Sequence, residues 1–321
     1  MRRLLAAASA LFVLAAGTAL AAPAESFLEI PGPQGPIKGT LLAAEAPNAP
    51  VVVIIPGSGP TDRDGNNPLG VAGKPYRLLA EALAERGVTT LRADKRGMFA
   101  SAGAITDANA ITIADYAGDA HAWASLLKQK TGAPCVWLLG HSEGALVAAV
   151  AAQDPKDLCG LVLVSGGGRR LSDVLREQIA GNPANPPELK AQAEHAISEL
   201  EAGRRVDTAG MHPALQPLFY PAVQGFLVSM FSYDPAALVK AYKGPVLVVQ
   251  GTTDIQVTLA DARRLASARP GVKLVELEGV NHLLKVAPAD RAANLATYAD
   301  PSLPLAPGVA DPIAAFVKAR H

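Results

Sequence analysis

The fold of this chain can be inferred from VWLLGHSEGALVAA, residues 136–149. An apolar block leads into Gly140-His141-Ser142-Glu143-Gly144, and small apolar residues follow. A buried strand, a tight turn with one serine between two glycines, and a helix form the context that a G-x-S-x-G nucleophile elbow requires. Larger side chains at the glycines would clash with neighbouring backbone. The turn lifts the Ser142 hydroxyl out of the sheet to a helix N-terminus, whose dipole favours a developing negative charge. We therefore interpret Ser142 as a nucleophile rather than as part of a chance match in a Gly-rich chain.

Strand and helix patterns alternate on both sides of this stretch. The expected strands, some with an adjoining turn, are 25–30, 36–45, 49–55, 89–97, 135–140, 159–168, 244–251 and 272–279. The expected helices are 74–88, 111–132, 144–154, 259–268 and 311–320. Alternation of this kind predicts a doubly wound, mostly parallel sheet of the α/β class.

The alternation breaks in the third quarter of the chain. Residues 168–243 are rich in helix formers and show no strong strand pattern, so they predict a helical cap inserted over the C-terminal edge of the sheet. The core then consists of 22–167 and 244–321. The apolar part of the insertion can roof a pocket or pack the cap onto the core, and packing is the favoured role for its bulkiest side chains, Phe226, Leu227, Met230 and Phe231.

The composition favours a globular chain without an electrostatic partner. Its 321 residues suffice for one large α/β domain with an insertion. Half of the residues are hydrophobic, and 29 basic residues balance 29 acidic ones. This balance argues against nucleic acid or an anionic membrane surface as a partner.

The N-terminus predicts a signal peptide over residues 1–21. Arg2 and Arg3 provide a positive start, an apolar stretch follows, and Ala19-Leu20-Ala21 fits the small-x-small pattern before a cleavage site. A transmembrane anchor is the alternative, since the apolar stretch almost reaches the ~20 residues that a span needs. Its Ala and Gly content favours cleavage. We therefore expect an exported protein, periplasmic or secreted, with no stable membrane insertion after the signal is removed.

Two polar residues after the last predicted strands can complete a triad with Ser142. Asp254 lies in the loop beyond 244–251, and His282 lies just beyond 272–279. Serine, acid and histidine follow in the order expected for this architecture, and both loops lie at the C-terminal edge, where open α/β sheets bind ligands. His282 is therefore the predicted general base and Asp254 the residue that orients it.

Other acids and histidines compete poorly for these roles. Asp261 is the second candidate acid, but it falls a turn or more into a helix. His141 sits inside the elbow and cannot turn onto its neighbour Ser142, so we expect a surface or packing role for it. The same role is expected for the remaining histidines, His121, His195, His212 and His321.

A loop crowded with Gly, Pro and Asp follows the strand at 49–55 and reads PGSGPTDRDGN, residues 56–66. The chain lacks the G-x-x-x-x-G-K-[ST] pattern of a phosphate loop. A calcium loop is also disfavoured, because its glycine would stand at the sixth position and a Glu at the twelfth. Asp62, Asp64 and Asn66 have the spacing of calcium ligands, but the glycine, Gly65, stands at the fourth position of such a loop. The twelfth position is Gly73 instead of a Glu.

The position of this loop, before the first core helix, instead predicts half of an oxyanion hole. Gly57 and Gly59 allow the backbone to approach a substrate, and the N–H of Ser58 is the predicted donor. The second donor is the N–H of Glu143, the residue after the nucleophile. Losing one such donor typically costs about 10²–10³ in rate.

Charged residues of the loop are expected to brace it through local ion pairs and Asx-type turns: Asp62, Arg63 and Asp64. A direct contact between Arg63 and the substrate is the less favoured alternative.

With these residues identified, the chain resembles the serine α/β-hydrolases, most closely the bacterial carboxylesterases described as esterase D-like. The resemblance covers nearly all of the chain after the signal peptide and rests on five motifs in order, PGSGPTDRDGN, DKRG, GHSEG, GTTDIQV and NHLLK. It implies an α/β-hydrolase fold with a helical cap, and ester hydrolysis without a metal or an organic cofactor. Pro56 and Ser58 depart from the typical H-G-x-G loop, but the backbone donor survives that change.

The predicted function is a serine carboxylesterase that hydrolyses small, short-chain carboxylic esters through an acyl-enzyme. A peptidase or an acyltransferase on the same fold is the nearest alternative, because triad geometry does not determine the leaving group. A peptidase acting at free N-termini would need an acidic anchor, for which the insertion offers Glu194, Glu199 and Glu201. A solvated helix face is the simpler role for these three. A binding protein without activity is disfavoured by the intact triad, and the oligomeric state is left open.

The only cysteines, Cys135 and Cys159, each come immediately before a buried strand. If those strands are parallel neighbours, the two residues lie ~4.8 Å apart at one edge, close to the ~4.4–6.8 Å Cα separation of disulfides. In an oxidising compartment we expect a bond. A pair of buried free thiols is the alternative.

Overall fold

The computed structural model describes residues 25–319. The predicted signal peptide, residues 1–21, therefore lies outside the described residues, as does His321. Within 25–319, no helix combines the length and apolar character needed to cross a membrane.

Eight strands form one sheet in the order β1-β2-β4-β3-β5-β6-β7-β8. Their bounds are β1 Glu25–Pro31, β2 Pro36–Leu42, β3 Val51–Ile55, β4 Thr89–Ala93, β5 Val136–His141, β6 Leu158–Val164, β7 Val246–Gly251 and β8 Lys273–Leu277. Strand β2 pairs antiparallel with β1 and β4, and the pairs from β4 through β3 to β8 are all parallel. The doubly wound, mostly parallel sheet that the alternation predicts is confirmed.

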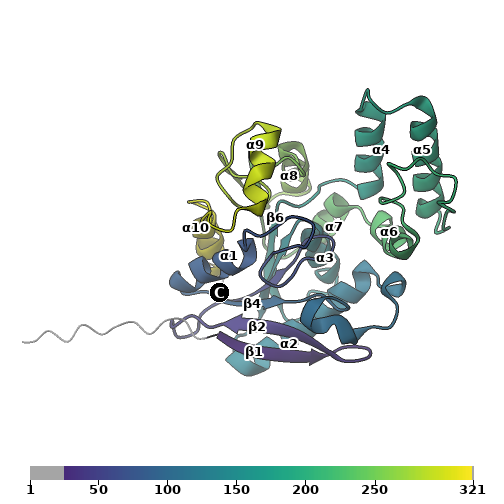
Figure 1. Cartoon of the computed structure of the whole chain (residues 1–321). Coiled ribbons are helices and arrows are strands. Elements are labelled where there is room, and N and C mark those ends of the chain that lie inside the picture. Colours follow the sequence, from purple (N-terminus) through teal and green to yellow (C-terminus); the bar gives the residue numbers. More distant parts are fainter. Residues whose placement is uncertain (1–24, 320–321) are drawn as a thin grey trace, which may run out of the picture.

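Helices cover both faces of the sheet, which explains why β3 and β5 are buried along their whole length. One face packs against α2 (Ile113–Thr131), α3 (Glu143–Ala151) and α8 (Leu259–Ser267). The other face packs against α1 (Pro75–Glu85) and α10 (Ala310–Lys318), which lie side by side in Figure 1. Helix α2 begins with a capping box of Thr112 and Asp115 and ends at Gly132, whose φ of 74° suits glycine.

Between β6 and β7 the chain runs through α4 (Leu171–Gly181), α5 (Pro187–Glu201), α6 (Gln224–Phe231) and α7 (Pro235–Ala241). Figure 1 shows α4 and α5 next to each other, standing away from the sheet. Leu227 and Phe231 are buried in a small core with α5, whereas Met230 joins the core of the sheet. These helices fill the predicted cap, 168–243, and its separation from the core as a distinct unit stays a prediction.

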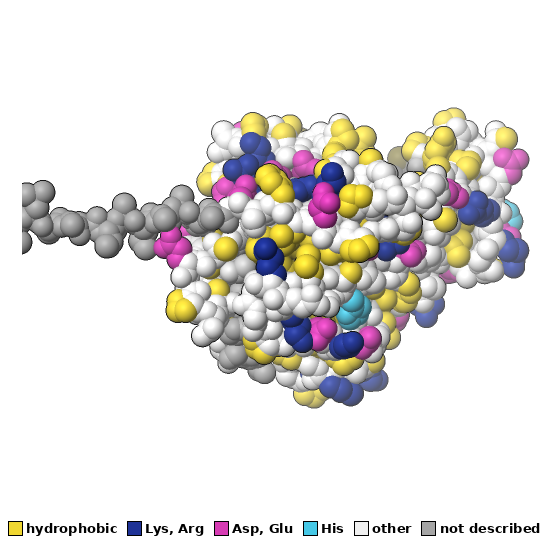
Figure 2. Space-filling view, turned by 90° about the horizontal axis from the view of Figure 1, so that it is seen from below, with side chains coloured by type: hydrophobic (Ala, Val, Ile, Leu, Met, Phe, Trp, Pro, Cys, Tyr) yellow, Lys and Arg dark blue, Asp and Glu magenta, His cyan; other side chains and the backbone are white. Residues whose placement is uncertain are grey.

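Several short elements were not predicted, because they span too few residues to show a period. They are α9 (Arg291–Ala296) and the 3₁₀ turns Phe99–Ala104, Ala108–Ala110, Pro221–Val223 and Thr297–Ala299. On the face shown in Figure 2, basic and acidic side chains lie interspersed and form no field of one sign.

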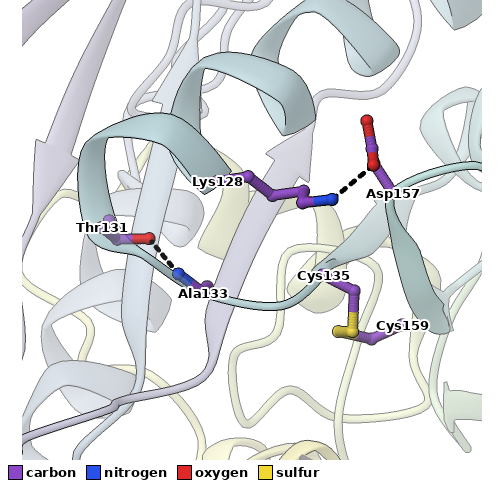
Figure 3. Close-up of a disulfide and its surroundings, with 6 residues drawn as sticks. All are labelled: Lys128, Thr131, Ala133, Cys135, Asp157 and Cys159. Carbon is purple, nitrogen blue, oxygen red and sulfur yellow. Dashed lines mark hydrogen bonds and ion pairs between the residues drawn. A yellow bond between two sulfur atoms is a disulfide. The ribbon is translucent and has the colours of Figure 1, made fainter.

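The disulfide predicted between Cys135 and Cys159 is present, with the Cα atoms 5.1 Å apart (Figure 3). Both residues lie at the N-terminal edge of the sheet, where β5 and β6 begin. One detail of the prediction was wrong, since Cys159 is the second residue of β6 rather than the residue before it. The β5–β6 register shifts between Val136 and Trp137, and Cys159 is the unpaired residue of that irregularity.

Candidate active site

Ser142 occupies a strained turn between β5 and α3. Its φ of 56° and ψ of −119° lie outside the regions that side-chain-bearing residues usually adopt. A Cβ on Gly140 would lie 2.0 Å from the Gly144 carbonyl oxygen, and a Cβ on Gly144 would lie 2.3 Å from the Ile55 carbonyl oxygen. Both glycines are therefore required by the close approach of backbone to backbone, as the elbow pattern predicts.

Asp254 and His282 lie in the loops after β7 and β8, and they meet at the C-terminal edge of the sheet. His282 Nδ1 is 2.8 Å from Asp254 Oδ2, and the two side chains are 5% and 0% exposed. Asp254 Oδ1 also accepts hydrogen bonds from the backbone N–H groups of Gln256 and Val257, at 2.8 and 3.0 Å. These contacts hold the carboxylate in one orientation toward the imidazole.

Burial acts to raise the pKa of the Asp254 carboxyl, but its interactions with His282 and the two N–H groups outweigh burial and lower that pKa. The carboxylate is thus ionised and accepts the Nδ1 hydrogen of His282. In the neutral ring this leaves Nε2 as the acceptor nitrogen. Ser142 and His282 line one cavity of about 150 Å³, so the structure brings all three predicted triad residues to one site.

Asp261, the second candidate acid, does not face His282. Its carboxylate accepts hydrogen bonds from Arg169 Nε at 2.9 Å and from the hydroxyl of Thr258 at 2.7 Å. It also lies in the first turn of α8, nearer the helix start than the sequence suggested. The geometry therefore favours Asp254 over Asp261 as the partner of His282.

Ser58 and Glu143 line a second cavity with Ser142, of about 230 Å³. Glu143 is the first residue of α3, so its N–H has no acceptor within the helix. Among the hydrogen bonds of residues 25–319, none uses the N–H of Ser58, whereas the N–H of Gly57 donates to the hydroxyl of Tyr76 at 2.9 Å. This arrangement leaves the N–H of Ser58 available and that of Gly57 engaged, and the assignment of Ser58 as oxyanion donor stays a prediction.

The cap and the core both contribute walls to the second cavity. Leu171 and Val174 of α4, Met230 of α6 and Leu146 of α3 all line it. The cavity beside the nucleophile therefore has apolar walls and also polar ones, which include Arg169, Gln178 and Asp261. Met230 lines it as well as packing against the core.

Sequence reasoning missed a buried ion pair below the oxyanion loop. Lys95 Nζ lies 3.3 Å from Glu143 Oε1 and donates to the carbonyl oxygen of Gly57 at 2.8 Å. The only sequence signal was the DKRG motif, in which Lys95 is the second residue. Because the pair joins the loop to the first residue of α3, it holds the two predicted oxyanion donors at a set spacing.

The charged residues of the loop act over longer range than predicted. Asp62 forms the expected Asx-type turn, since its Oδ1 accepts from the N–H groups of Asp64 and Asn66 at 2.9 and 2.8 Å. Arg63, however, binds Asp94 through two nitrogens, and Asp64 pairs with Arg92, so these ion pairs are not local. Arg63 lines neither cavity beside Ser142. The less favoured alternative, a substrate contact by Arg63, has no support from its position.

His141, for which a surface or packing role was expected, lies buried behind Ser142 and makes polar contacts that the sequence did not predict. It is 3% exposed, and both ring nitrogens are engaged, Nδ1 with the hydroxyl of Tyr76 at 2.9 Å and Nε2 with the carbonyl oxygen of His282 at 2.8 Å. The sequence offered no signal for this role beyond the position of His141 next to Ser142.

The acidic residues proposed as an amine anchor are engaged elsewhere. Glu194 and Glu201 pair with Arg176, and Glu199 pairs with Arg204. None of the three lines either cavity beside Ser142. Within residues 25–319 there is also no group of three or more His, Cys, Asp or Glu side chains placed to hold a metal ion.

Comparison with known proteins gives a consistent match. The sequence profile described as "Alpha/beta hydrolase family" matches residues 51–297. Esterase EstD of Thermotoga maritima is 28% identical over 242 residues, which cover 73% of this chain and 54% of EstD. The chain thus spans about half the length of this curated relative.

Two solved structures show a similar fold. Est1E from Butyrivibrio proteoclasticus is 18% identical, with a TM-score of 0.57 over 92% of this chain and 98% of Est1E. Esterase Pf2001 of Pyrococcus furiosus is 17% identical, with a TM-score of 0.51 over 81% of this chain and 85% of Pf2001.

Proposed function

The chain belongs to the alpha/beta hydrolase family, and from this premise we propose that it is a serine carboxylesterase. The observation that carries the proposal is the contact between His282 Nδ1 and Asp254 Oδ2, at 2.8 Å. His282 and Ser142 line the same cavity. Similarity to Esterase EstD supports ester bonds as the target.

The proposed reaction begins when Ser142 Oγ attacks the ester carbonyl and His282 Nε2 takes its proton. Asp254 holds the imidazole in the tautomer with hydrogen on Nδ1 and stabilises the imidazolium that forms. The N–H groups of Ser58 and Glu143 bind the oxyanion. His282 then delivers the proton to the leaving alcohol, and water hydrolyses the acyl-enzyme with the same groups in the same roles.

The cavity between cap and core favours a short acyl group. Its volume of about 230 Å³ lies below the range of roughly 300–1,000 Å³ of sites for drug-sized ligands. Met230 and Leu146 give it apolar walls. A long acyl chain would have to displace the cap or remain in solvent.

We also propose that the protein is exported, as the sequence of residues 1–21 predicts. The disulfide between Cys135 and Cys159 supports this, because such bonds persist in oxidising compartments and are rare in the cytosol.

The test of function compares hydrolysis of p-nitrophenyl esters of rising acyl length with hydrolysis of aminoacyl-arylamides. We expect the highest kcat/KM with short esters. Ser142→Ala and His282→Ala should each lower kcat by roughly 10⁴-fold, and the double variant should be hardly worse than either single one. His195→Ala, on the exposed face of α5, is the matched control. Faster cleavage of arylamides would favour the peptidase alternative, and near-wild-type turnover in His282→Ala would contradict the assignment of the base.

A further inference from the structure

A continuous hydrogen-bonded chain runs behind the candidate site from the oxyanion loop to the base. Gly57 N–H donates to Tyr76 Oη at 2.9 Å, Tyr76 Oη lies 2.9 Å from His141 Nδ1, and His141 Nε2 lies 2.8 Å from the carbonyl oxygen of His282. All four residues are buried. These hydrogen bonds therefore link the loop after β3, helix α1, the end of β5 and the loop after β8.

The donors and acceptors of this chain allow one direction only. The carbonyl of His282 can only accept, so Nε2 of a neutral His141 carries the hydrogen. Nδ1 is then the acceptor, and the Tyr76 hydroxyl must donate to it. The same hydroxyl accepts from Gly57 N–H. Every donor and acceptor along the chain is used, and no alternative arrangement satisfies all of them.

His141 remains neutral throughout, because burial lowers its pKa to about 3. Its ring centroid lies 4.7 Å from that of His282 and 5.3 Å from that of Tyr76. The ring of the proposed base thus rests against an uncharged ring that is itself held at both nitrogens. When His282 takes a proton in the reaction, His141 does not compete for it.

The two ends of the chain are adjacent to the groups that must be aligned on the reacting carbonyl. Gly57 directly precedes Ser58, the proposed donor, and a Cβ on Gly57 would lie only 3.2 Å from Ser142 Cβ. The other end holds the backbone of His282 itself. Oxyanion donor and base belong to loops more than 200 positions apart in sequence, so covalent connection does not set their spacing.

We propose that Tyr76 and His141 are positioning residues, which tie the backbone of His282 to Gly57 and so hold base and oxyanion donor in register about Ser142. The inference rests on the proposed function, because it gives these hydrogen bonds a role in the proposed ester hydrolysis. Both residues line the cavity of about 150 Å³ beside Ser142, and the proposed role acts through Gly57 and His282 rather than on the reacting atoms. Misplacement of reacting groups by about 1 Å can cost on the order of 10²-fold in rate, and this is the effect expected when the chain is broken.

The test uses variants that remove polar atoms and keep the rings. Tyr76→Phe removes Oη, and His141→Phe removes both nitrogens. His141→Gln restores an N–H donor toward the His282 carbonyl, and it also serves if the Phe variant does not fold. Tyr242→Phe is the matched control, because Tyr242 is similarly buried but lines neither cavity beside Ser142. Urea unfolding of each variant shows whether it is folded.

Two readouts are measured for the full-length protein: the rate at which a fluorophosphonate probe labels Ser142, and kcat and KM for a short p-nitrophenyl ester. We expect Tyr76→Phe and His141→Phe to lower labelling and kcat by about 10²-fold with KM nearly unchanged. The double variant should be no slower than the slower single variant, because both break the same chain. His141→Gln should recover part of the loss, and Tyr242→Phe should behave as wild type.

The inference is overturned if both single variants label within about threefold of wild type, or if their losses multiply in the double variant. Absence of recovery in a folded His141→Gln variant would also contradict it. Labelling separates this outcome from the proposed function. If the wild-type protein is labelled but hydrolyses no ester, the proposed esterase function is contradicted, and the labelling rates of the variants still test the role of Tyr76 and His141. If the wild-type protein is not labelled, both proposals are contradicted.

Discussion

Replacement of Lys95 by Met should destabilise the protein strongly, and a second replacement should restore part of the loss. Lys95 and Glu143 form an ion pair with an N–O distance of 3.3 Å, and their side chains are 6% and 3% exposed. In Lys95→Met the Glu143 carboxylate loses its partner while buried. Removing one partner of a buried pair typically costs about 3–5 kcal/mol, because the remaining charge is neither solvated nor paired.

The double variant Lys95→Met/Glu143→Gln should be more stable than Lys95→Met alone. With both charges removed, what remains is the carbonyl of Gly57 without its donor, which accepts from Lys95 at 2.8 Å in the wild type. A buried acceptor left unsatisfied costs about 1–3 kcal/mol. The second substitution is therefore expected to recover on the order of 2 kcal/mol.

Urea unfolding in non-reducing buffer measures these changes, with fluorescence of the buried Trp123 and Trp137 as the signal. Arg77→Met is the control, because the Arg77–Glu81 pair is exposed to 45% and 43%. Loss of such a surface pair should cost less than about 1 kcal/mol. A double variant less stable than Lys95→Met, or a Lys95→Met no less stable than the control, would refute the reasoning.

Two further predictions concern stability. Replacing Cys135 and Cys159 by Ser should lower the free energy of unfolding by about 3–4 kcal/mol, because the disulfide joins residues separated by 24 positions. A loss below about 1 kcal/mol would argue against this estimate. Kcat should be unchanged, since the bond lies at the edge opposite the candidate site. The pKa of the Asp254 carboxyl is lower in the folded state than in the unfolded state, where it is about 3.9. The free energy of unfolding therefore includes a contribution that is fully present above pH ~3.9 and is lost as the pH falls through the folded-state pKa. Asp254→Asn should therefore show a smaller loss of urea midpoint on acidification, and an identical acid slope would contradict the assigned shift.

The parts of this protein that follow local rules could be predicted from the sequence. The strand at 51–55 is a run of five apolar residues, and such a run is buried on both faces in a parallel sheet. The elbow needs glycine at 140 and 144 because of steric contacts within a few residues and with the neighbouring strand. Asp254 and His282 could be identified because strand ends in a parallel sheet share one edge, whatever the remaining packing.

The polar contacts behind the candidate site were decided only by the tertiary structure. His141 lies next to Ser142 in sequence, yet its partners are Tyr76 and the His282 carbonyl, 65 and 141 positions away. Lys95 and Glu143 are 48 positions apart. Nothing local distinguishes these residues from polar residues on the surface.

The physical reason lies in the strand order. A buried polar group must find a partner, but its own position does not say which one. The sheet order β4-β3-β5-β6-β7-β8 brings the ends of strands that are distant in sequence to one edge. There the loops after β3, β5 and β8 place Gly57, Ser142 and His282 around one cavity. Lys95, after β4, reaches the Gly57 carbonyl from the same edge, and these polar contacts follow from that meeting alone.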